Sequence, residues 1–216
     1  GALDTMVRAA IATIFLGIAA PAFPAAAQDI PDVEAGISLF WTSNYEGTES
    51  SFRERVVAAG DDWAIYQTLL DDELSDVAGA EVFYVLFSGI DYRDCSGDPM
   101  PGDAERAALA ALFPLQEGAV IEETSYPGNP VIRVGGAQDF FLMGETVSAH
   151  EVVMDYAEND EDNEDETLIV LSDRPYTVAV DWGDRGMDRV MLIAQSDETP
   201  DVPGQDLRGT CAALLN

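Results

Sequence analysis

The sequence contains no lysine, a single histidine and only two cysteines, and each shortage argues against a class of function. One histidine, His150, and two distant cysteines do not make the usual ligand set of a zinc site. The chain also has no G-x-S-x-G motif, so His150 has no expected nucleophile beside it. We therefore expect no catalytic residues and no enzymatic activity.

Positive charge is scarce throughout the chain. All 10 basic residues are arginines, and they are set against 41 acidic residues, which gives a formal net charge of −31. Such a surface repels nucleic acid and attracts cations or basic proteins. We expect no nucleic-acid partner. A basic protein is one partner that suits this charge, and solubility in a saline medium is the alternative explanation for it.

Long apolar runs are also missing. The longest, residues 9–20, is too short to span a bilayer, so no transmembrane segment is expected. This run follows an arginine and is itself followed by two prolines and a run of alanines that ends at Ala27, a pattern typical of a signal peptide. We assign residues 1–27 to the signal peptide and the residues before it, and predict cleavage before Gln28. Residues 28–216 would then be a single periplasmic or secreted domain.

The two cysteines, Cys95 and Cys211, are far apart in the sequence. In an exported chain with two cysteines, one intramolecular disulfide is the expected outcome. A reactive thiol pair is the alternative, but the spacing has nothing of a C-x-x-C motif. We predict a Cys95–Cys211 disulfide that fastens the polar C-terminal tail.

Short segments of β-branched and aromatic residues, separated by turn residues, predict a mainly β domain. The predicted strands are residues 37–42, 51–58, 63–70, 81–87, 119–124, 131–134, 139–143, 146–156, 167–171, 176–180 and 190–194. Residues 81–87 are the most apolar of these, so we place them centrally in an antiparallel sheet. The Ala- and Leu-rich residues 104–113 predict one helix that packs on the sheet.

Three stretches carry a resemblance to a known type of domain. Residues 112–118 (LFPLQEG) are similar to a PL-x-x-G turn, residues 144–153 (GETVSAHEVV) look like an E-x-V strand, and residues 171–178 (LSDRPYTV) look like the start of a closing hairpin. Over residues 38–194 the chain thus resembles an uncharacterised type of bacterial periplasmic antiparallel-β domain that is compared with lipoprotein-carrier half-barrels. This resemblance implies a curved antiparallel sheet, a half-barrel or open barrel, around one packed α-helix. It implies no catalytic residue.

The predicted strands between residues 37 and 87 are rich in aromatic residues. If the sheet is curved, these side chains can line an apolar ligand pocket. The alternative is that they form the core. The candidate ligand-binding residues are Trp41, Trp63, Tyr66, Phe83, Tyr84 and Phe87.

The most acidic stretch, residues 158–166, holds seven carboxylates in nine residues. Calcium takes six to eight oxygen ligands, and Asp160, Asp162 and Asp165 are the candidates here. The stretch lacks the glycine that an EF-hand loop needs, and mutual repulsion favours a solvated loop as the alternative. Apart from this calcium, no cofactor is expected.

Together these features favour a non-catalytic binding or accessory protein that holds an apolar small molecule or a partner segment. An acidic module that binds a basic partner or calcium is the first alternative. A hydrolase that uses two carboxylates is the second, although with 41 acidic residues the sequence nominates no pair.

Overall fold

The computed structural model describes residues 29–70, 81–157, 165–196 and 209–215. The predicted signal peptide lies outside these residues. The strands are β1 (Ile37–Tyr45), β2 (Thr48–Ala59), β3 (Trp63–Leu70), β4 (Glu81–Phe87), β5 (Asp91–Asp94), β6 (Val120–Ile121), β7 (Val131–Leu142), β8 (Glu145–Asp155), β9 (Glu166–Leu171), β10 (Thr177–Asp181) and β11 (Gly186–Gln195). The helices are α1 (Asp103–Ala110) and two 3₁₀ turns, η2 (Gly183–Arg185) and η4 (Thr210–Leu214).

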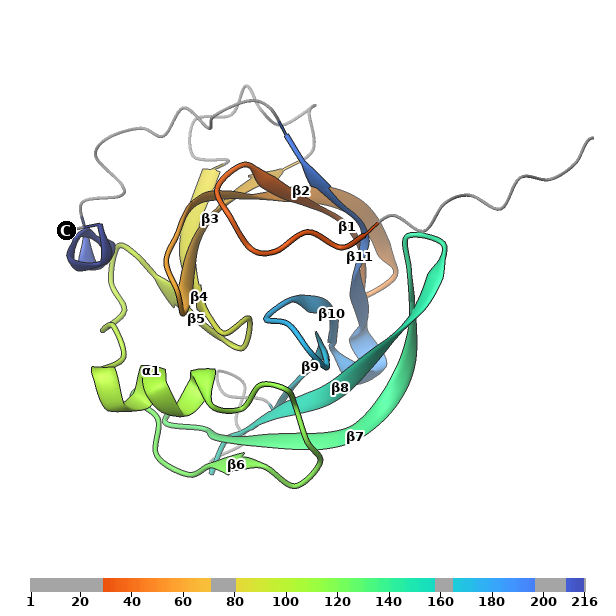
Figure 1. The fold of residues 1–216 in the computed structure, drawn as a ribbon. Helices are drawn as coiled ribbons and strands as arrows, with labels where there is room; N and C mark the ends of the chain where they lie inside the picture. Colours follow the sequence, from red (N-terminus) through yellow and green to blue (C-terminus); the bar gives the residue numbers. More distant parts are fainter. Residues whose placement is uncertain (1–28, 71–80, 158–164, 197–208, 216) are drawn as a thin grey trace, which may run out of the picture.

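All the strands in the described ranges belong to one antiparallel sheet of 11 strands, in the order β5-β4-β3-β2-β1-β11-β10-β9-β8-β7-β6. The sheet curls so strongly that its two edges, β5 and β6, both come near α1 (Figure 1). The two edges do not pair with each other, so the sheet stays open. This confirms the predicted fold class, a mainly β domain with a curved antiparallel sheet and one packed α-helix.

Each strand pairs with its neighbours in the sequence, except that the edge strands β5 and β6 do not pair and β1 pairs with β11. This pairing runs from Ile37 opposite Gln195 to Tyr45 opposite Gly186. At its end the two backbones come so close that a Cβ added to Gly186 would lie 1.7 Å from the carbonyl oxygen of Asn44. The φ angle of Gly186 is +120°, which L side chains rarely adopt. Glycine is therefore required where the first and last strands meet.

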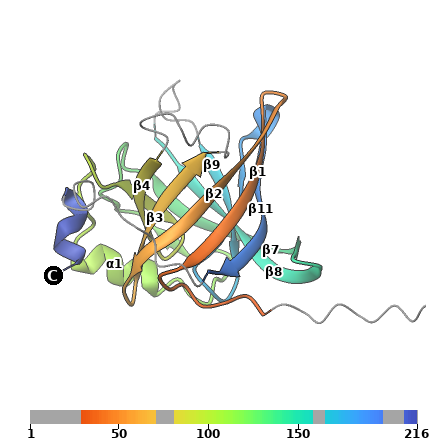
Figure 2. The same ribbon diagram turned by 90° about the horizontal axis from the view of Figure 1, so that it is seen from above.

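The helix α1 covers the opening between the two edges of the sheet (Figures 1 and 2). Leu109 of α1 is buried in one core cluster with Phe87 of β4 and Ile121 of β6, so the helix shares a core with strands on both sides of the opening. The helix ends at Ala110, three residues earlier than predicted, and the buried Leu112 follows it in a turn.

The predicted central position of residues 81–87 is wrong, because β4 lies next to the edge strand β5. Val85 and Phe87 belong to the core cluster that includes α1, whereas Tyr84 and Leu86 point into the concave side of the sheet. Since both faces of β4 are covered, the strand is apolar on both faces, as a central strand would be.

A buried arginine joins the edge strand β5 to the rest of the molecule. The side chains of Arg93 and Asp91 are fully buried and form a two-pronged ion pair, with N–O distances of 2.5 and 2.6 Å. The Arg93 guanidinium also donates to the carbonyl oxygens of Pro99, at 2.7 Å, and Ser125, at 3.2 Å. Its Nη2 lies 3.2 Å from Oε1 of Glu105 on α1. One guanidinium therefore links β5, the helix and the loop before β7.

A disulfide lies next to this network. Cys95 and Cys211 are bonded, with an Sγ–Sγ distance of 2.08 Å, and both are buried. The backbone N–H of Thr210 also donates to the carbonyl oxygen of Cys95 at 2.8 Å. The predicted disulfide is confirmed, and it fastens η4 beside the edge strand β5.

The turn between β4 and β5 reaches across the concave side of the sheet. Gly89 in this turn has a φ angle of +68°, and a Cβ there would lie 2.4 Å from the carbonyl oxygen of Pro175. The hydroxyl of Thr177 on β10 donates to the carbonyl oxygen of Gly89. This contact joins two parts of the sheet that are distant in the strand order.

Replacing Arg93 should destabilise the protein far more than replacing an exposed arginine. We expect Arg93→Met to lower the free energy of unfolding by about 3–5 kcal/mol, because it leaves Asp91 buried without a counter-charge. Arg133 and Asp155 form an ion pair of 2.9 Å whose side chains are about half exposed, so Arg133→Met should cost at most about 1 kcal/mol. Urea denaturation followed by circular dichroism measures both losses.

A double variant separates the lost charge pair from lost packing. Asp91→Leu combined with Arg93→Met removes both charges and should recover much of the stability lost in Arg93→Met alone. Equal losses in the Arg93 and Arg133 variants would contradict the role assigned to the buried pair.

Candidate functional site

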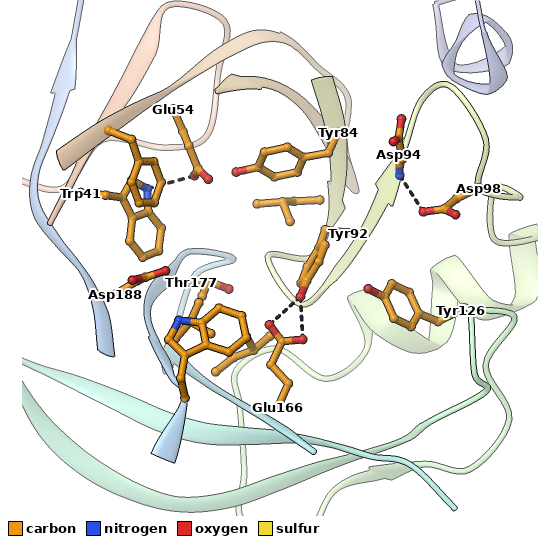
Figure 3. Close-up of a pocket in the computed structure, with 15 residues that line it drawn as sticks. Trp41, Glu54, Tyr84, Tyr92, Asp94, Asp98, Tyr126, Glu166, Thr177 and Asp188 are labelled. Atoms are coloured by element: carbon orange, nitrogen blue, oxygen red, sulfur yellow. Dashed lines mark hydrogen bonds between the residues drawn. The ribbon is translucent and has the colours of Figure 1, made fainter. Parts of the chain in front are cut away.

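A cavity of about 420 Å³ lies in the hollow of the curved sheet, and we call it the main cavity (Figure 3). Its described lining contains six aromatic residues, Trp41, Phe52, Tyr84, Tyr92, Tyr126 and Trp182. It also contains five acidic residues, Glu54, Asp94, Asp98, Glu166 and Asp188. Leu86, Leu168, Val180 and Thr177 complete it, and none of these described lining residues is basic.

Strand alternation explains how a glutamate enters this apolar hollow. In the pairing of β1 with β2, Trp41 lies opposite Phe52 and Leu39 lies opposite Glu54. Because successive side chains of a strand point to opposite faces, Glu54 shares the inner face with Phe52, and its basic neighbours in the sequence point away. Glu54 was missed in the sequence analysis, although its place between Phe52 and Val56 at a period of two was the signal that could have found it.

Glu54 is buried without an ionic partner in the described part of the chain. It is 7% exposed, and its Oε2 accepts a hydrogen bond from Nε1 of Trp41 at 3.0 Å. Burial raises the pKa of Glu54 to about 8; the hydrogen bond from Trp41 opposes this shift, and the charge of Asp188 adds to it. At pH 7 the Glu54 carboxyl is therefore mostly protonated.

Two further polar atoms beside the main cavity have no protein partner in the described structure. They are Oδ1 of Asp188 on β11 and the indole Nε1 of Trp182, and both are buried. Buried polar atoms are nearly always hydrogen-bonded, to water where no protein group is available. One acceptor and one donor at the cavity wall are therefore available to a bound molecule.

A second carboxyl group is surrounded by tyrosines. The hydroxyl of Tyr92 lies 2.5 Å from both carboxyl oxygens of Glu166, which is mostly buried. Burial raises the pKa of Glu166, and the hydrogen bond from Tyr92 opposes the shift. The rings of Tyr84 and Tyr126 meet Tyr92 edge to face, with centroid distances of 6.4 and 5.8 Å. This side of the main cavity therefore combines the carboxyl group of Glu166 with three tyrosine rings.

The six aromatic residues predicted to bind a ligand are divided between different places. Trp41 and Tyr84 line the main cavity, whereas Trp63 and Tyr66 line a second cavity of about 320 Å³. Phe87 is fully buried in the core cluster that includes α1. The side chain of Phe83 lies outside the described part of the structure.

Four aromatic residues of the main cavity were not among the predicted ligand-binding residues, namely Phe52, Tyr92, Tyr126 and Trp182. Tyr126 and Trp182 lie in segments that the sequence pattern assigns to turns. Turns are expected to lie at the surface. The sequence alone does not show that these two segments fold back over the hollow of the sheet.

The predicted calcium ligands are only partly described. Asp160 and Asp162 lie outside the described residues. Asp165 is exposed, and its Oδ1 accepts a hydrogen bond from the backbone N–H of Tyr156 at 3.0 Å. Within the described ranges no three acidic, histidine or cysteine residues are grouped as a metal site would require.

His150 does have a hydroxyl partner, contrary to the expectation from the sequence. Its Nδ1 lies 2.8 Å from Oγ of Ser172, and Ser172 also contacts Ser148 at 2.8 Å. Neither His150 nor Ser172 lines the main cavity or the second cavity. The contact joins β8 to the turn after β9, and it lies in the wall of neither cavity.

Comparisons with protein-family models, with curated proteins and with solved structures gave no match to this chain. Among the described residues, no helix is long and apolar enough to cross a membrane. The geometry of the main cavity is therefore the basis on which a function is proposed.

The raised pKa of Glu54 should make the stability of the protein depend on pH. A carboxyl group whose pKa is higher in the folded state stabilises the protein most below its unfolded pKa of about 4.5, and this contribution is lost as the pH rises toward about 8. Each pKa unit corresponds to about 1.4 kcal/mol, so the loss amounts to several kcal/mol.

Glu54→Gln isolates this contribution because glutamine keeps the shape and carries no titrating group. We expect the variant to gain stability relative to the unmodified protein as the pH rises from 5 to 8. Urea denaturation at several pH values measures the difference. Glu49→Gln, an exposed change on the same strand, is the matched control, and a parallel pH dependence in both variants would refute the effect.

Proposed function

We propose that this protein is a small-molecule-binding protein whose main cavity holds a ligand with an apolar body. The observation that carries the proposal is the cavity itself, with a volume of about 420 Å³ and a wall of aromatic and aliphatic side chains interrupted by a few polar atoms. Ligand pockets typically have volumes of about 300–1,000 Å³ and this mixture of linings.

The rigidity of the walls supports binding to a preformed site. The rings of Trp41 and Phe52 are stacked, with centroids 5.5 Å apart and an angle of 7° between their planes. Tyr84 is stacked in the same way on Tyr66, at 5.7 Å. Because these rings lie on paired strands and support each other, little ordering is needed when a ligand binds, which favours affinity.

We also propose that the protein acts after export, in the periplasm or outside the cell. The signal-peptide pattern before Gln28 motivates this proposal. The Cys95–Cys211 disulfide supports it, because such bonds persist in oxidising compartments.

Filling the main cavity should abolish binding of an apolar probe. We expect N-phenyl-1-naphthylamine, a neutral fluorescent probe, to bind the unmodified protein with saturation at one molecule per chain. Val180→Trp places a large ring in the main cavity and should remove this binding. Ala110→Trp makes a comparable change beside the second cavity and should leave it intact.

Fluorescence titration of the probe into the unmodified protein and the two variants measures this binding. Circular dichroism of each variant confirms that it is folded. Binding that survives Val180→Trp but not Ala110→Trp would move the site to the second cavity and overturn the proposal for the main one.

A second candidate function is hydrolysis with two carboxyl groups. The specific observation is that Glu54, with a pKa near 8, shares the main cavity with Asp188. In such a pair one carboxyl group can donate a proton while the other acts as a carboxylate.

Hydrolysis of this kind has a defined pH profile. Activity on a panel of chromogenic glycosides and esters should fall as the pH rises above about 8, because Glu54 then loses its proton. Glu54→Gln should abolish that activity. A panel that yields no turnover removes this candidate and leaves the binding function.

A further inference from the structure

The charged side chains in the described lining of the main cavity distinguish it from a purely apolar pocket. All five charged residues in its described lining are acidic. Two of them, Asp94 and Asp98, accept hydrogen bonds within their own turn, from Ser96 and from the backbone N–H of Asp94. Glu166 accepts from Tyr92. Glu54 accepts a hydrogen bond from Trp41, and Oδ1 of Asp188 has no partner in the described protein.

The arginines nearest to Glu54 in the sequence do not neutralise it. Arg53 lies over the ring of Phe40, 5.9 Å from its centroid, and Arg55 bonds to Oε1 of Gln67. Both arginines point to the opposite face of β2 from Glu54, as strand alternation requires. Neither arginine therefore lies beside Glu54 on the inner face of the sheet.

The rings around these acids add a second attraction for positive charge. Figure 3 shows the carboxyl groups of Glu54 and Asp188 and the ring of Trp41 directed toward the same space. The face of an aromatic ring attracts a cation, and a nearby carboxylate adds a charge-assisted hydrogen bond. An inorganic cation would find aromatic carbon where it needs a shell of oxygen ligands.

We propose that the ligand of the main cavity is an organic cation, an amine on an apolar body, whose N–H donors bind Glu54 and Asp188. This inference rests on the proposed binding function and specifies the class of ligand. The apolar body lies against Trp41, Phe52 and Tyr84. The net charge of −31 raises the local concentration of such cations and repels anions of the same shape.

Binding of the amine is coupled to loss of a proton. The groups that face Glu54 are Trp41 on β1, Asp188 on β11 and the phenol of Tyr66 on β3, and none of them supplies a positive charge. An ammonium group placed beside Glu54 favours its ionised form, so the proton leaves as the ligand enters. Affinity for the amine therefore rises as the pH approaches the pKa of about 8.

Three probes with one shape and different charge test the inference. They are 4-phenylbutylamine, 4-phenylbutanol and 4-phenylbutyrate, measured by isothermal titration calorimetry at pH 8. We expect the amine to bind at least about tenfold more tightly than the alcohol, and the carboxylate to show no binding. The alcohol reports whether the cavity holds an apolar body, and the amine reports whether it selects positive charge.

Variants locate the charge preference. Glu54→Gln and Asp188→Asn should each bring the affinity for the amine close to the affinity of the same variant for the alcohol. Retained binding of the alcohol also shows that the variants are folded. Glu49→Gln, which is exposed on the same strand, should change neither affinity.

Proton release is the independent readout. At pH 7, titrations in two buffers of different ionisation enthalpy should show about one proton released per amine bound, and none for the alcohol. Equal affinities for amine and alcohol would overturn the inference about charge and leave the proposed function intact. If neither the alcohol nor N-phenyl-1-naphthylamine binds, the proposed function itself fails.

Discussion

The buried ion pair of Arg93 with Asp91 is the interaction on which the open architecture depends. A sheet that curls without closing leaves unpaired backbone at both edges and an unprotected gap to its interior. Here the guanidinium bonds to Asp91 on the edge strand, to Glu105 on α1 and to the carbonyl oxygens of two loops. Because these partners come from the elements on either side of the gap, a single cation helps to fix the helix that covers it.

The distribution of the few arginines explains the character of the cavity. Arg93 and Arg106 secure the region of α1 through ion pairs with Asp91 and Asp62, and Arg53 covers a ring on the outer face. None of the residues described in the cavity lining is basic, and the chain has no lysine that could enter it. Burial raises the pKa of two of the carboxyl groups inside, those of Glu54 and Glu166, which favours their neutral forms in a cavity without basic lining residues.

Much of the fold could be predicted, and the candidate site only in part. Enrichment in β-branched and aromatic residues located strands such as β3 with correct bounds, and the two cysteines predicted their own bond. The position of β4 in the sheet could not be predicted, because a strand covered by a helix on its outer face has the same apolar composition as a central strand. Trp41 and Tyr84 were anticipated as part of the site. Trp182 was not, because its place in the hollow depends on how a turn folds back.

The disulfide joins the two halves of the sheet, which are separate in the sequence. Strands β1 to β5 precede the loop of residues 96–102, and β6 to β11 follow it, while Cys95 lies before that loop and Cys211 lies near the end of the chain. A protease that cuts within this loop would therefore produce two polypeptides that remain one molecule until the bond is reduced. Hydrogen bonds between β1 and β11 would hold the same two fragments in register. Such a nicked protein would keep its full mass on a non-reducing gel and separate only when a reductant is added.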